Sequence, residues 1–355
     1  MTITDVINLI RPNIINLKPY SSARHEFSGN ANVFLDANEN PYGSPLTQSF
    51  NRYPDPLQLD IKKKLSEIKN VPIDRIFVGH GSDETIDIII RMFCVPNQDE
   101  IIILPPTYGM YEVAANIHDI KVQKVVLTDD FQPDLSAIKK NISPHTKIIF
   151  FCSPNNPTGN LIEPFAIQDI LENFHGIVVI DEAYIDYAPS SSSWLNNLSR
   201  YPNLIILQTL SKAWGLAGLR LGMAFAHPSI IEIMNKVKMP YNINSLTQQK
   251  VLEALNNIQF LNDSIEKNNQ EKEKLYQALK KFSFISKIYP TDANFILVQF
   301  DNPNEIYLHL LNYKIVVRNR SQVEKCEGCL RITIGTSEEN QLLLNALSSF
   351  KSSSL

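Results

Sequence analysis

The stretch NLIILQTLSKAWGLAGLRLG, residues 203–222, joins an uninterrupted apolar run to a lysine, a glycine-rich turn and an arginine. The run NLIILQ (203–208) has the length and composition of a strand that is buried on both faces. An amine held among apolar residues has a lowered pKa and reacts readily with carbonyl carbons, so Lys212 is a candidate nucleophile. The alternative interpretation is a solvated charge at the start of a helix. Arg220, eight positions on, has the planar fork that binds phosphate.

Six further apolar runs are distributed along the chain, and amphipathic segments separate them. In the segment 82–93, Ile86, Ile89, Ile90 and Phe93 recur at helical spacing. The runs are RIFVG (75–79), EIIILP (100–105), VQKVVL (122–127), KIIFFC (147–152), GIVVID (176–181) and GMAFAH (222–227). Continuous apolar strands that alternate with helices predict an α/β fold, with a mostly parallel seven-stranded sheet covered on both faces.

The pattern changes after about residue 240. A long polar stretch over 246–282 has helical character, and three separate strand-like runs follow it. These runs are NFILVQ (294–299), KIVVRN (314–319) and CLRITIG (329–335). We therefore predict a large domain over residues 44–245. The N-terminal arm, 1–43, and the C-terminal part, 246–355, are expected to form a smaller α+β domain.

Charge and composition exclude several classes of protein. The chain has 355 residues, of which 44% are hydrophobic and 20% charged, and a formal net charge of −4. These are ordinary globular values, and the charge offers no basic field for nucleic acid or an anionic membrane. Neither a secretory signal nor an apolar stretch long enough to span a membrane is present in the sequence. We expect a cytoplasmic protein that binds neither nucleic acid nor membrane.

The four cysteines point to a reducing compartment. Cys94 and Cys152 lie in apolar surroundings and are expected to be reduced core residues. Cys326 and Cys329 form the sequence CEGC, which has the spacing of half a zinc site. A structural zinc needs four ligands, and neither a second cysteine pair nor a histidine cluster accompanies these two. We predict no bound metal.

Polar motifs follow five of the predicted strands. In a parallel sheet with helices on both faces, ligands bind beyond the carboxyl ends of the strands. Taken singly, each motif has a structural alternative, such as a helix cap, a packed ring or a tight turn. The motifs are GSDE (81–84), PTYGMY (106–111), SPNNPTG (153–159), DEAY (181–184) and SKAWGLAGLR (211–220).

One ligand requires all five motifs at once. Pyridoxal phosphate needs a lysine for its aldehyde, an acid against its pyridine nitrogen, a donor to its phenolate oxygen and a stacking aromatic ring. Its phosphate needs a helix amino end and an arginine. The coincidence of these features at separate strand ends is far less expected by chance than any one of them.

The order of these motifs resembles that of the fold-type I pyridoxal-phosphate-dependent aminotransferases. Together with KPYSSAR (18–24), DANENPYG (36–43), RYPDP (52–56) and CLRITIGT (329–336), the chain is similar to the histidinol-phosphate branch of that family over nearly its whole length. Trp214 stands where phenylalanine is commoner in the family. The resemblance implies a fold-type I transferase, a homodimer and an enzyme of histidine biosynthesis.

The resemblance also implies a role for each matching residue around the cofactor. Lys212 would form the Schiff base and then move the substrate's proton, with Asp181 on the pyridine nitrogen and Tyr108 stacked on the ring. Asn156 and Tyr184 would bind the phenolate oxygen. The residues implied around the phosphate are Ser82, Asp83, Ser211, Arg220 and, from the partner subunit, Tyr53.

Substrate recognition is implied at four further positions. Arg331 resembles the family's anion-binding arginine, Arg318 would be a second one, and Tyr20 and Asn38 would lie near the substrate. For Arg318 a surface salt bridge is the alternative interpretation, and for Tyr20 a core position. The implied reaction transfers an amino group reversibly between L-histidinol phosphate and 2-oxoglutarate, giving imidazole-acetol phosphate and glutamate.

Other functions remain open at this point. A threonine-phosphate decarboxylase or an aromatic-amino-acid aminotransferase would use the same scaffold and nearly the same motifs. A non-catalytic metabolite-binding module is disfavoured because Lys212 is present and no DNA-binding segment is attached. A nucleotide-dependent dehydrogenase is excluded because no GxGxxG sequence follows any of the strand runs.

Overall fold

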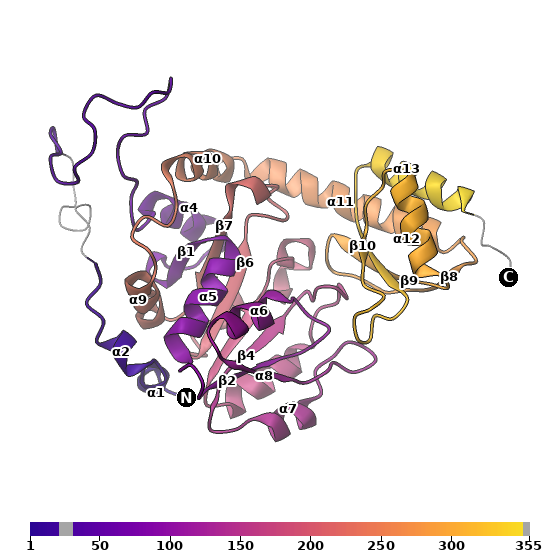
Figure 1. Cartoon of the computed structure of the whole chain (residues 1–355), viewed down its shortest axis with the longest axis horizontal. Coiled ribbons are helices and arrows are strands. Elements are labelled where there is room, and N and C mark those ends of the chain that lie inside the picture. The colour runs from indigo at the N-terminus through magenta and orange to yellow at the C-terminus, as the bar shows by residue number, and fades with distance from the viewer. Residues whose placement is uncertain (21–30, 351–355) are drawn as a thin grey trace.

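A seven-stranded sheet forms the centre of the larger part of the molecule (Figure 1). The structure, a computed structural model, describes residues 1–20 and 31–350. The strands are β1 (Ile76–His80), β2 (Glu100–Ile103), β3 (Lys121–Lys124), β4 (Thr146–Cys152), β5 (Ile177–Asp181), β6 (Leu204–Thr209) and β7 (Leu221–Phe225). They lie in the order β1-β7-β6-β5-β4-β2-β3, and only β7 runs antiparallel to its neighbours. The predicted mostly parallel seven-stranded sheet is confirmed.

Helices cover both faces of this sheet, as continuous apolar strands require. In β5, Val178 and Ile180 pack into the hydrophobic cluster that contains α4 and α8, whereas Ile177 and Val179 pack into the one that contains α5, α6 and α9. The helices are α4 (Leu59–Lys69), α5 (Gly81–Phe93), α6 (Met110–Ile117), α7 (Leu135–Asn141), α8 (Pro164–Asn173) and α9 (Pro228–Val237).

A second sheet of four antiparallel strands lies apart from the first (Figure 1). Its order is β10-β11-β9-β8, and the helices α11, α12 and α13 share its core. These elements are α11 (Ile258–Leu279), β8 (Ile285–Ile288), β9 (Phe295–Phe300), α12 (Pro303–Asn312), β10 (Arg318–Asn319), β11 (Cys329–Thr333) and α13 (Ser337–Ser349). The sequence did not indicate β8, and the run KIVVRN contributes only the two residues of β10.

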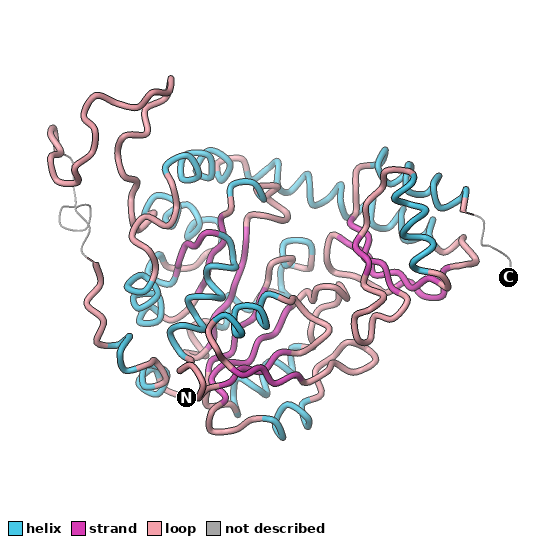
Figure 2. The backbone as a smooth tube through the Cα atoms, viewed as in Figure 1, coloured by secondary structure: helices cyan, strands magenta, loops and turns pink. Residues whose placement is uncertain are grey.

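The polar stretch 246–282 is two helices rather than one. They are α10 (Ser245–Leu255) and α11, and the side chain of Asn257 caps the second by accepting from Phe260 N at 3.4 Å. Helix α11 runs from one sheet to the other (Figures 1 and 2). Leu261 near its start packs in the core of the large sheet, and Leu275 near its end packs in the core of the small sheet. The two sheets are therefore joined by one continuous helix.

The first helix of the N-terminal arm lies against the large sheet and not against the small one. Val6 and Ile10, at and beyond helix α1 (Ile3–Asn8), are buried in the same cluster as α5 and α9, and a short helix α2 (Pro12–Ile15) follows. Residues 31–58 contain no helix or strand and run along the side far from the small sheet (Figure 2). We expected residues 1–43 to belong to the smaller domain. The first helix differs from this expectation, because its apolar residues pack in the core of the large sheet. The domain division itself stays a prediction, and the last four residues of KPYSSAR lie outside the described residues.

No helix within residues 1–20 and 31–350 is both long and apolar enough to cross a membrane. All four cysteines are free and buried. In that same part of the chain, no cluster of three or more His, Cys, Asp and Glu side chains is arranged to hold a metal ion.

Glu100 anchors the edge of the sheet that lies away from the polar motifs. Its carboxylate accepts hydrogen bonds from Ser143 Oγ at 2.7 Å, Thr146 Oγ1 at 2.8 Å and Gln123 Nε2 at 3.1 Å. Burial raises the pKa of Glu100, but these donors, together with Lys121 Nζ at 3.1 Å from Oε2, outweigh burial and hold it at about 2, below the ordinary value of 4.5. The carboxylate therefore stabilises the fold above pH 4.5, and this contribution is lost as the pH falls toward 2.

We expect Glu100→Gln to lower the free energy of unfolding at pH 7 by about 1–3 kcal/mol, because the amide presents a donor to hydroxyl donors. The difference from the parent should shrink as the pH is lowered below 4.5. Urea denaturation at a series of pH values measures both effects. Glu112→Gln, which removes a surface ion pair with Lys124, is the control and should cost less than about 0.5 kcal/mol. Equal losses in the two variants would contradict the role of Glu100.

Candidate active site

One pocket opens at the carboxyl ends of β4, β5 and β6, and nine of the residues singled out in the sequence line it. It receives side chains from each of the five polar motifs, although these are far apart in the chain. Parallel strands bring their carboxyl ends to the same edge of a sheet, which is why the motifs converge. The nine are Ser82, Asp83, Tyr108, Asn156, Asp181, Tyr184, Ser211, Lys212 and Arg220.

Asp181, the last residue of β5, lies at the bottom of the pocket with 2% of its surface exposed. Oδ2 accepts a hydrogen bond from the hydroxyl of Tyr111 at 2.7 Å, and Oδ1 accepts one from the backbone N–H of Ala183 at 3.0 Å. Burial raises the pKa of Asp181 to about 6, while these two donors lower it. The carboxyl is thus desolvated but held ionised near neutral pH.

Lys212 stands at the open side of the pocket, three residues beyond the end of β6. Its side chain is exposed, so the prediction of a buried amine is wrong; the residue belongs to the turn after the strand and not to an apolar element. Partial desolvation and then the positive charge of Arg331 lower the pKa of Lys212. Nζ lies 5.4 Å from the ring centroid of Tyr184 and has no hydrogen-bond or ion-pair partner among residues 1–20 and 31–350.

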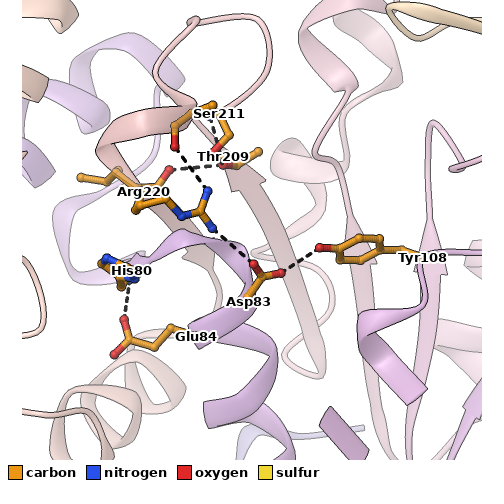
Figure 3. A network of polar contacts seen from close by, with 9 residues as sticks. His80, Asp83, Glu84, Tyr108, Thr209, Ser211 and Arg220 are labelled. Carbon is orange, nitrogen blue, oxygen red and sulfur yellow. Dashed lines mark hydrogen bonds and ion pairs between the residues drawn. The ribbon is translucent and has the colours of Figure 1, made fainter. Parts of the chain in front are cut away.

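The amino end of α5 forms one wall of the pocket, with Asp83 between two partners (Figure 3). The hydroxyl of Tyr108 donates to Asp83 Oδ1 at 2.9 Å, and Arg220 Nη2 lies 3.3 Å from Asp83 Oδ2. A Cβ on Gly81, which has φ +74°, would lie 2.7 Å from Arg220 Nη2. Glycine is therefore required for the arginine to lie across the helix end. A carboxylate only accepts hydrogen bonds, so the backbone N–H of Asp83 is its one group that can donate to a phosphate.

Asn156 and Arg331 join the two sheets at the pocket. Arg331 Nη1 donates to Asn156 Oδ1, and its guanidinium lies 5.0 Å from the ring centroid of Phe295. Successive side chains of a strand point to opposite faces of its sheet. In β11, Leu330 and Ile332 face the helix-covered core, so Arg331 between them faces the other side. Asn156 Nδ2 has no partner within the described part of the chain, and Arg331 Nε is buried without one. Both groups therefore have unused hydrogen-bonding capacity, and that of Asn156 lies in the lining of the pocket.

Five residues indicated by the sequence do not line this pocket: Arg331 borders it through Asn156, and the other four lie elsewhere. Tyr53 and Asn38 line a separate open groove, where the Tyr53 ring stacks on Tyr241 with centroids 4.4 Å apart. Tyr20 lines another groove and is 73% exposed, so it is not a core residue of this chain. Arg318, on β10, is directly opposite Arg331 in the sheet and is exposed. Within residues 1–20 and 31–350 it forms no salt bridge, contrary to the alternative interpretation.

The donor set in the pocket fits pyridoxal phosphate. Ser82, Ser211 and the first-turn N–H groups of α5 supply donors for a phosphate, and Arg220 supplies a positive charge. A carboxylate, an unpaired amine and an unpaired amide donor occupy the remaining walls, in Asp181, Lys212 and Asn156. A heteroaromatic ring with a basic nitrogen and an aldehyde matches all three.

Three residues around the site are not indicated by the sequence. Tyr111 belongs to the motif PTYGMY, but nothing in the motif indicates its pairing with Asp181, because the two residues are 70 positions apart. Thr209 Oγ1 donates to Ser211 Oγ at 3.0 Å and accepts from Ser211 N, which fixes the turn before Lys212 (Figure 3). Phe295 lies beside both Arg331 and Tyr184. None of these three has a signal in the sequence beyond its place near a motif.

Comparison with known proteins agrees with this geometry. The family model "Aminotransferase class I and II" matches residues 31–347. A histidinol-phosphate aminotransferase of Parabacteroides distasonis is 52% identical over 347 residues, which is 98% of this chain and 99% of that protein.

Two solved structures share the fold. The histidinol-phosphate aminotransferase of Clostridium acetobutylicum superposes with a TM-score of 0.77 at 25% identity, over 84% of this chain and 90% of that one. The L-threonine-O-3-phosphate decarboxylase of Porphyromonas gingivalis superposes with a TM-score of 0.72 at 21% identity, over 85% and 91%. At this identity the second likeness concerns the fold alone. The family match and the near full-length relative show that this chain belongs to the aminotransferase class I and II family.

Proposed function

We propose that this chain is a histidinol-phosphate aminotransferase that transfers an amino group between L-histidinol phosphate and 2-oxoglutarate. The observation that carries the proposal is the 52% identity to a protein of that name over nearly the whole of both chains. The pocket supports it, because an unpaired amine, a buried carboxylate and a phosphate-binding helix end converge there. Members of this family depend on pyridoxal phosphate, which when bound supplies an electron sink for the substrate's Cα.

Lys212 has two roles in the proposed reaction. Its amine would hold the cofactor covalently through the aldehyde carbon and would move the proton at the substrate's Cα. The lowered pKa of Lys212 suits a base that works near neutral pH. Nothing in the described part of the chain pairs with the amine, so it moves between these two tasks without breaking a salt bridge.

The other pocket residues hold the cofactor in the proposed orientation. Asp181 would keep a proton on the pyridine nitrogen, and Tyr108, whose hydroxyl is fixed by Asp83, would stack on the ring. Asn156, through its free Nδ2, and Tyr184 would donate to the phenolate oxygen. Ser82, Ser211, Arg220 and the backbone N–H of Asp83 bind the phosphate.

The anions of both substrates are proposed to bind at Arg331, with Arg318 beside it. A guanidinium group can donate two parallel hydrogen bonds to a phosphate or to a carboxylate. An enzyme that uses both histidinol phosphate and glutamate needs a group of this kind. The pairing of β10 with β11 places the two arginines directly opposite each other. Burial lowers the pKa of Arg331, and Arg318 lowers it further, so an incoming anion relieves the repulsion between these charges.

A homodimer with shared active sites is the second part of the proposal. Tyr53 does not line the pocket of its own chain, and its hydroxyl has no partner within the described residues. The groove in which it lies is bordered by an arm with large exposed apolar side chains, including Leu35 at 89% and Tyr42 at 96%. Exposed apolar surface of this kind is expected at an interface, here with a second copy. Tyr20 and Asn38 are proposed to reach a substrate across the same interface.

We expect Tyr53→Phe to weaken the retention of pyridoxal phosphate about 10- to 100-fold, because a hydrogen bond to a charged phosphate is lost. Tyr241→Phe is the matched control, since it removes a hydroxyl from the other ring of the same stack. Fluorescence titration of the apoprotein measures the affinity, and analytical ultracentrifugation measures the assembly. Equal affinities in the two variants, or full cofactor binding by a monomer, would contradict the shared site.

A cytoplasmic location belongs to the same proposal. It is supported by the four free, buried cysteines, which suit a compartment where thiols stay reduced. The only partners proposed are the small-molecule substrates and the second copy of the chain.

A single half-reaction tests the proposed activity. The protein is loaded with pyridoxal phosphate and mixed with L-histidinol phosphate, with no keto acid present, and the visible spectrum is recorded. We expect the yellow colour to disappear as pyridoxamine phosphate forms, and 2-oxoglutarate to restore it. Parallel samples receive L-threonine phosphate or L-phenylalanine, and released CO₂ is measured. Decarboxylation of threonine phosphate, or a response to phenylalanine alone, would replace the proposed function.

A further inference from the structure

Tyr111 lies behind the pocket. It does not line the pocket itself but contacts Asp181, which does. It is completely buried, and its hydroxyl donates to Asp181 Oδ2 at 2.7 Å. The contact joins the start of α6 to the end of β5. Burial, followed by the charge of Asp181, raises the pKa of Tyr111 well above its ordinary value. The hydroxyl therefore keeps its proton and remains a donor at neutral pH.

The ring of Tyr111 is fixed before any ligand binds. It stacks on Phe150 with centroids 4.7 Å apart and planes at 14°, and the ring of Tyr108 meets it edge-on at 5.6 Å. Phe150 belongs to β4, the strand beside β5, so the stack is part of the sheet's own core. Because its ring is packed on two sides, the Tyr111 hydroxyl already points at Asp181. The side chain therefore loses no rotational freedom when a ligand enters the pocket.

The other groups around Asp181 do not replace this donor. The backbone N–H of Ala183 satisfies Oδ1 and leaves Oδ2 to Tyr111 alone. Asp83 raises the pKa of Asp181 by its negative charge, and Lys212 lowers it. Cys152 is directly opposite Asp181 on the neighbouring strand, and burial keeps its thiol protonated and neutral by raising its pKa. Tyr111 is thus the one side chain within the described residues that donates a hydrogen bond to Asp181.

We propose that Tyr111 is a positioning residue that keeps the Asp181 carboxylate ionised and turned toward the pocket, so that Asp181 can hold a proton on the ring nitrogen of the bound cofactor. The inference rests on the proposed function in that the ring is taken to be that of pyridoxal phosphate. Without the hydroxyl, Oδ2 would be buried and unpaired, and a buried carboxyl in that state takes up the proton itself. The ring nitrogen would then lose the ionised partner that keeps it protonated.

The first test uses the apoprotein and needs neither cofactor nor substrate. Aspartate labelled with ¹³C at the carboxyl carbon is incorporated, and the pKa of Asp181 is read from its NMR titration, with Asp181→Asn to assign the signal. In Tyr111→Phe, which keeps the ring stack, we expect the pKa to rise by about one unit or more from its value in the parent. Tyr108→Phe, the matched control, removes a hydroxyl from the same pocket that bonds Asp83 instead, and should not reproduce the rise. An unchanged pKa in Tyr111→Phe overturns the proposal.

The second test reads the proton on the cofactor itself. Pyridoxal phosphate labelled with ¹⁵N is bound, and the ¹⁵N shift of the ring nitrogen reports its protonation. We expect the protonated fraction to fall in Tyr111→Phe. In the Asp181→Asn background the same substitution should cause no further change, because the group through which Tyr111 acts has been removed. A fall of equal size in both backgrounds would show a general effect on packing and overturn the proposal.

A double-mutant cycle in stability covers the case in which Tyr111→Phe folds poorly. Asp181→Asn in the same chain removes the unpaired carboxylate, so the double variant should be more stable than Tyr111→Phe alone. The absence of any recovery would count against a coupling between the two side chains. The outcome is separate from that of the half-reaction: an enzyme that ignores histidinol phosphate but shows the shifted Asp181 pKa retains the role of Tyr111 and loses only the proposed substrate.

Discussion

Lys212→Ala is expected to lower the turnover of histidinol phosphate by about 10⁴-fold or more, because both the covalent bond to the cofactor and the base at Cα are removed. The fold should be unaffected. The side chain is exposed and unpaired within the described part of the chain, so we expect a change in the free energy of unfolding of less than about 0.5 kcal/mol. Stopped-flow half-reactions and urea denaturation measure the two quantities.

Lys212→Arg is the control for charge at this position. It keeps a cation beside the pocket but has no amine that can bond the cofactor, so it should be as inactive as the alanine variant. Turnover within tenfold of the parent in either variant would refute the assignment of Lys212. A large loss of stability in Lys212→Ala would instead indicate that the amine has a structural partner that the single chain does not contain.

Arg331→Ala is expected to lower kcat/KM by about 10²- to 10³-fold for histidinol phosphate and for glutamate together, since one guanidinium is proposed to bind the anion of each. The effect should lie mainly in KM. Lys212 is untouched, so the yellow colour of the loaded protein should persist. Steady-state kinetics with each substrate in turn, and titration of the loaded protein with substrate analogues, provide the measurement.

Two further variants separate charge from geometry at this site. Arg331→Lys retains the charge without the fork and should recover only part of the activity, because it cannot bind a phosphate or a carboxylate in two places. Arg318→Ala removes the exposed neighbour on β10 and should have a smaller effect than Arg331→Ala. A loss confined to one of the two substrates would contradict a common anion site.

The sequence by itself determined the large sheet and the polar side chains at the carboxyl ends of its strands. Uninterrupted apolar runs indicate strands because a strand covered on both faces must be apolar along its whole length. Each of the seven runs overlaps a strand, although β3 at the edge includes only part of VQKVVL and is not buried. The residues after those runs converge because parallel strands end at one edge, and this follows from the fold class alone. The nine pocket residues implied by the motifs and by the family resemblance all lie at this edge.

Tertiary structure decided what depends on contacts between distant segments. The apolar content of β7 indicates a strand but not its direction, which is set by hydrogen bonding to β1 and β6. Three other features have no local signal in the sequence. They are the exposure of Lys212, the location of Tyr53 outside its own chain's pocket and the packing of the first helix on the large sheet. Tyr111 shows the reason most clearly: its bond to Asp181 spans 70 residues, and a sequence fixes which side chains are available but not which of them meet.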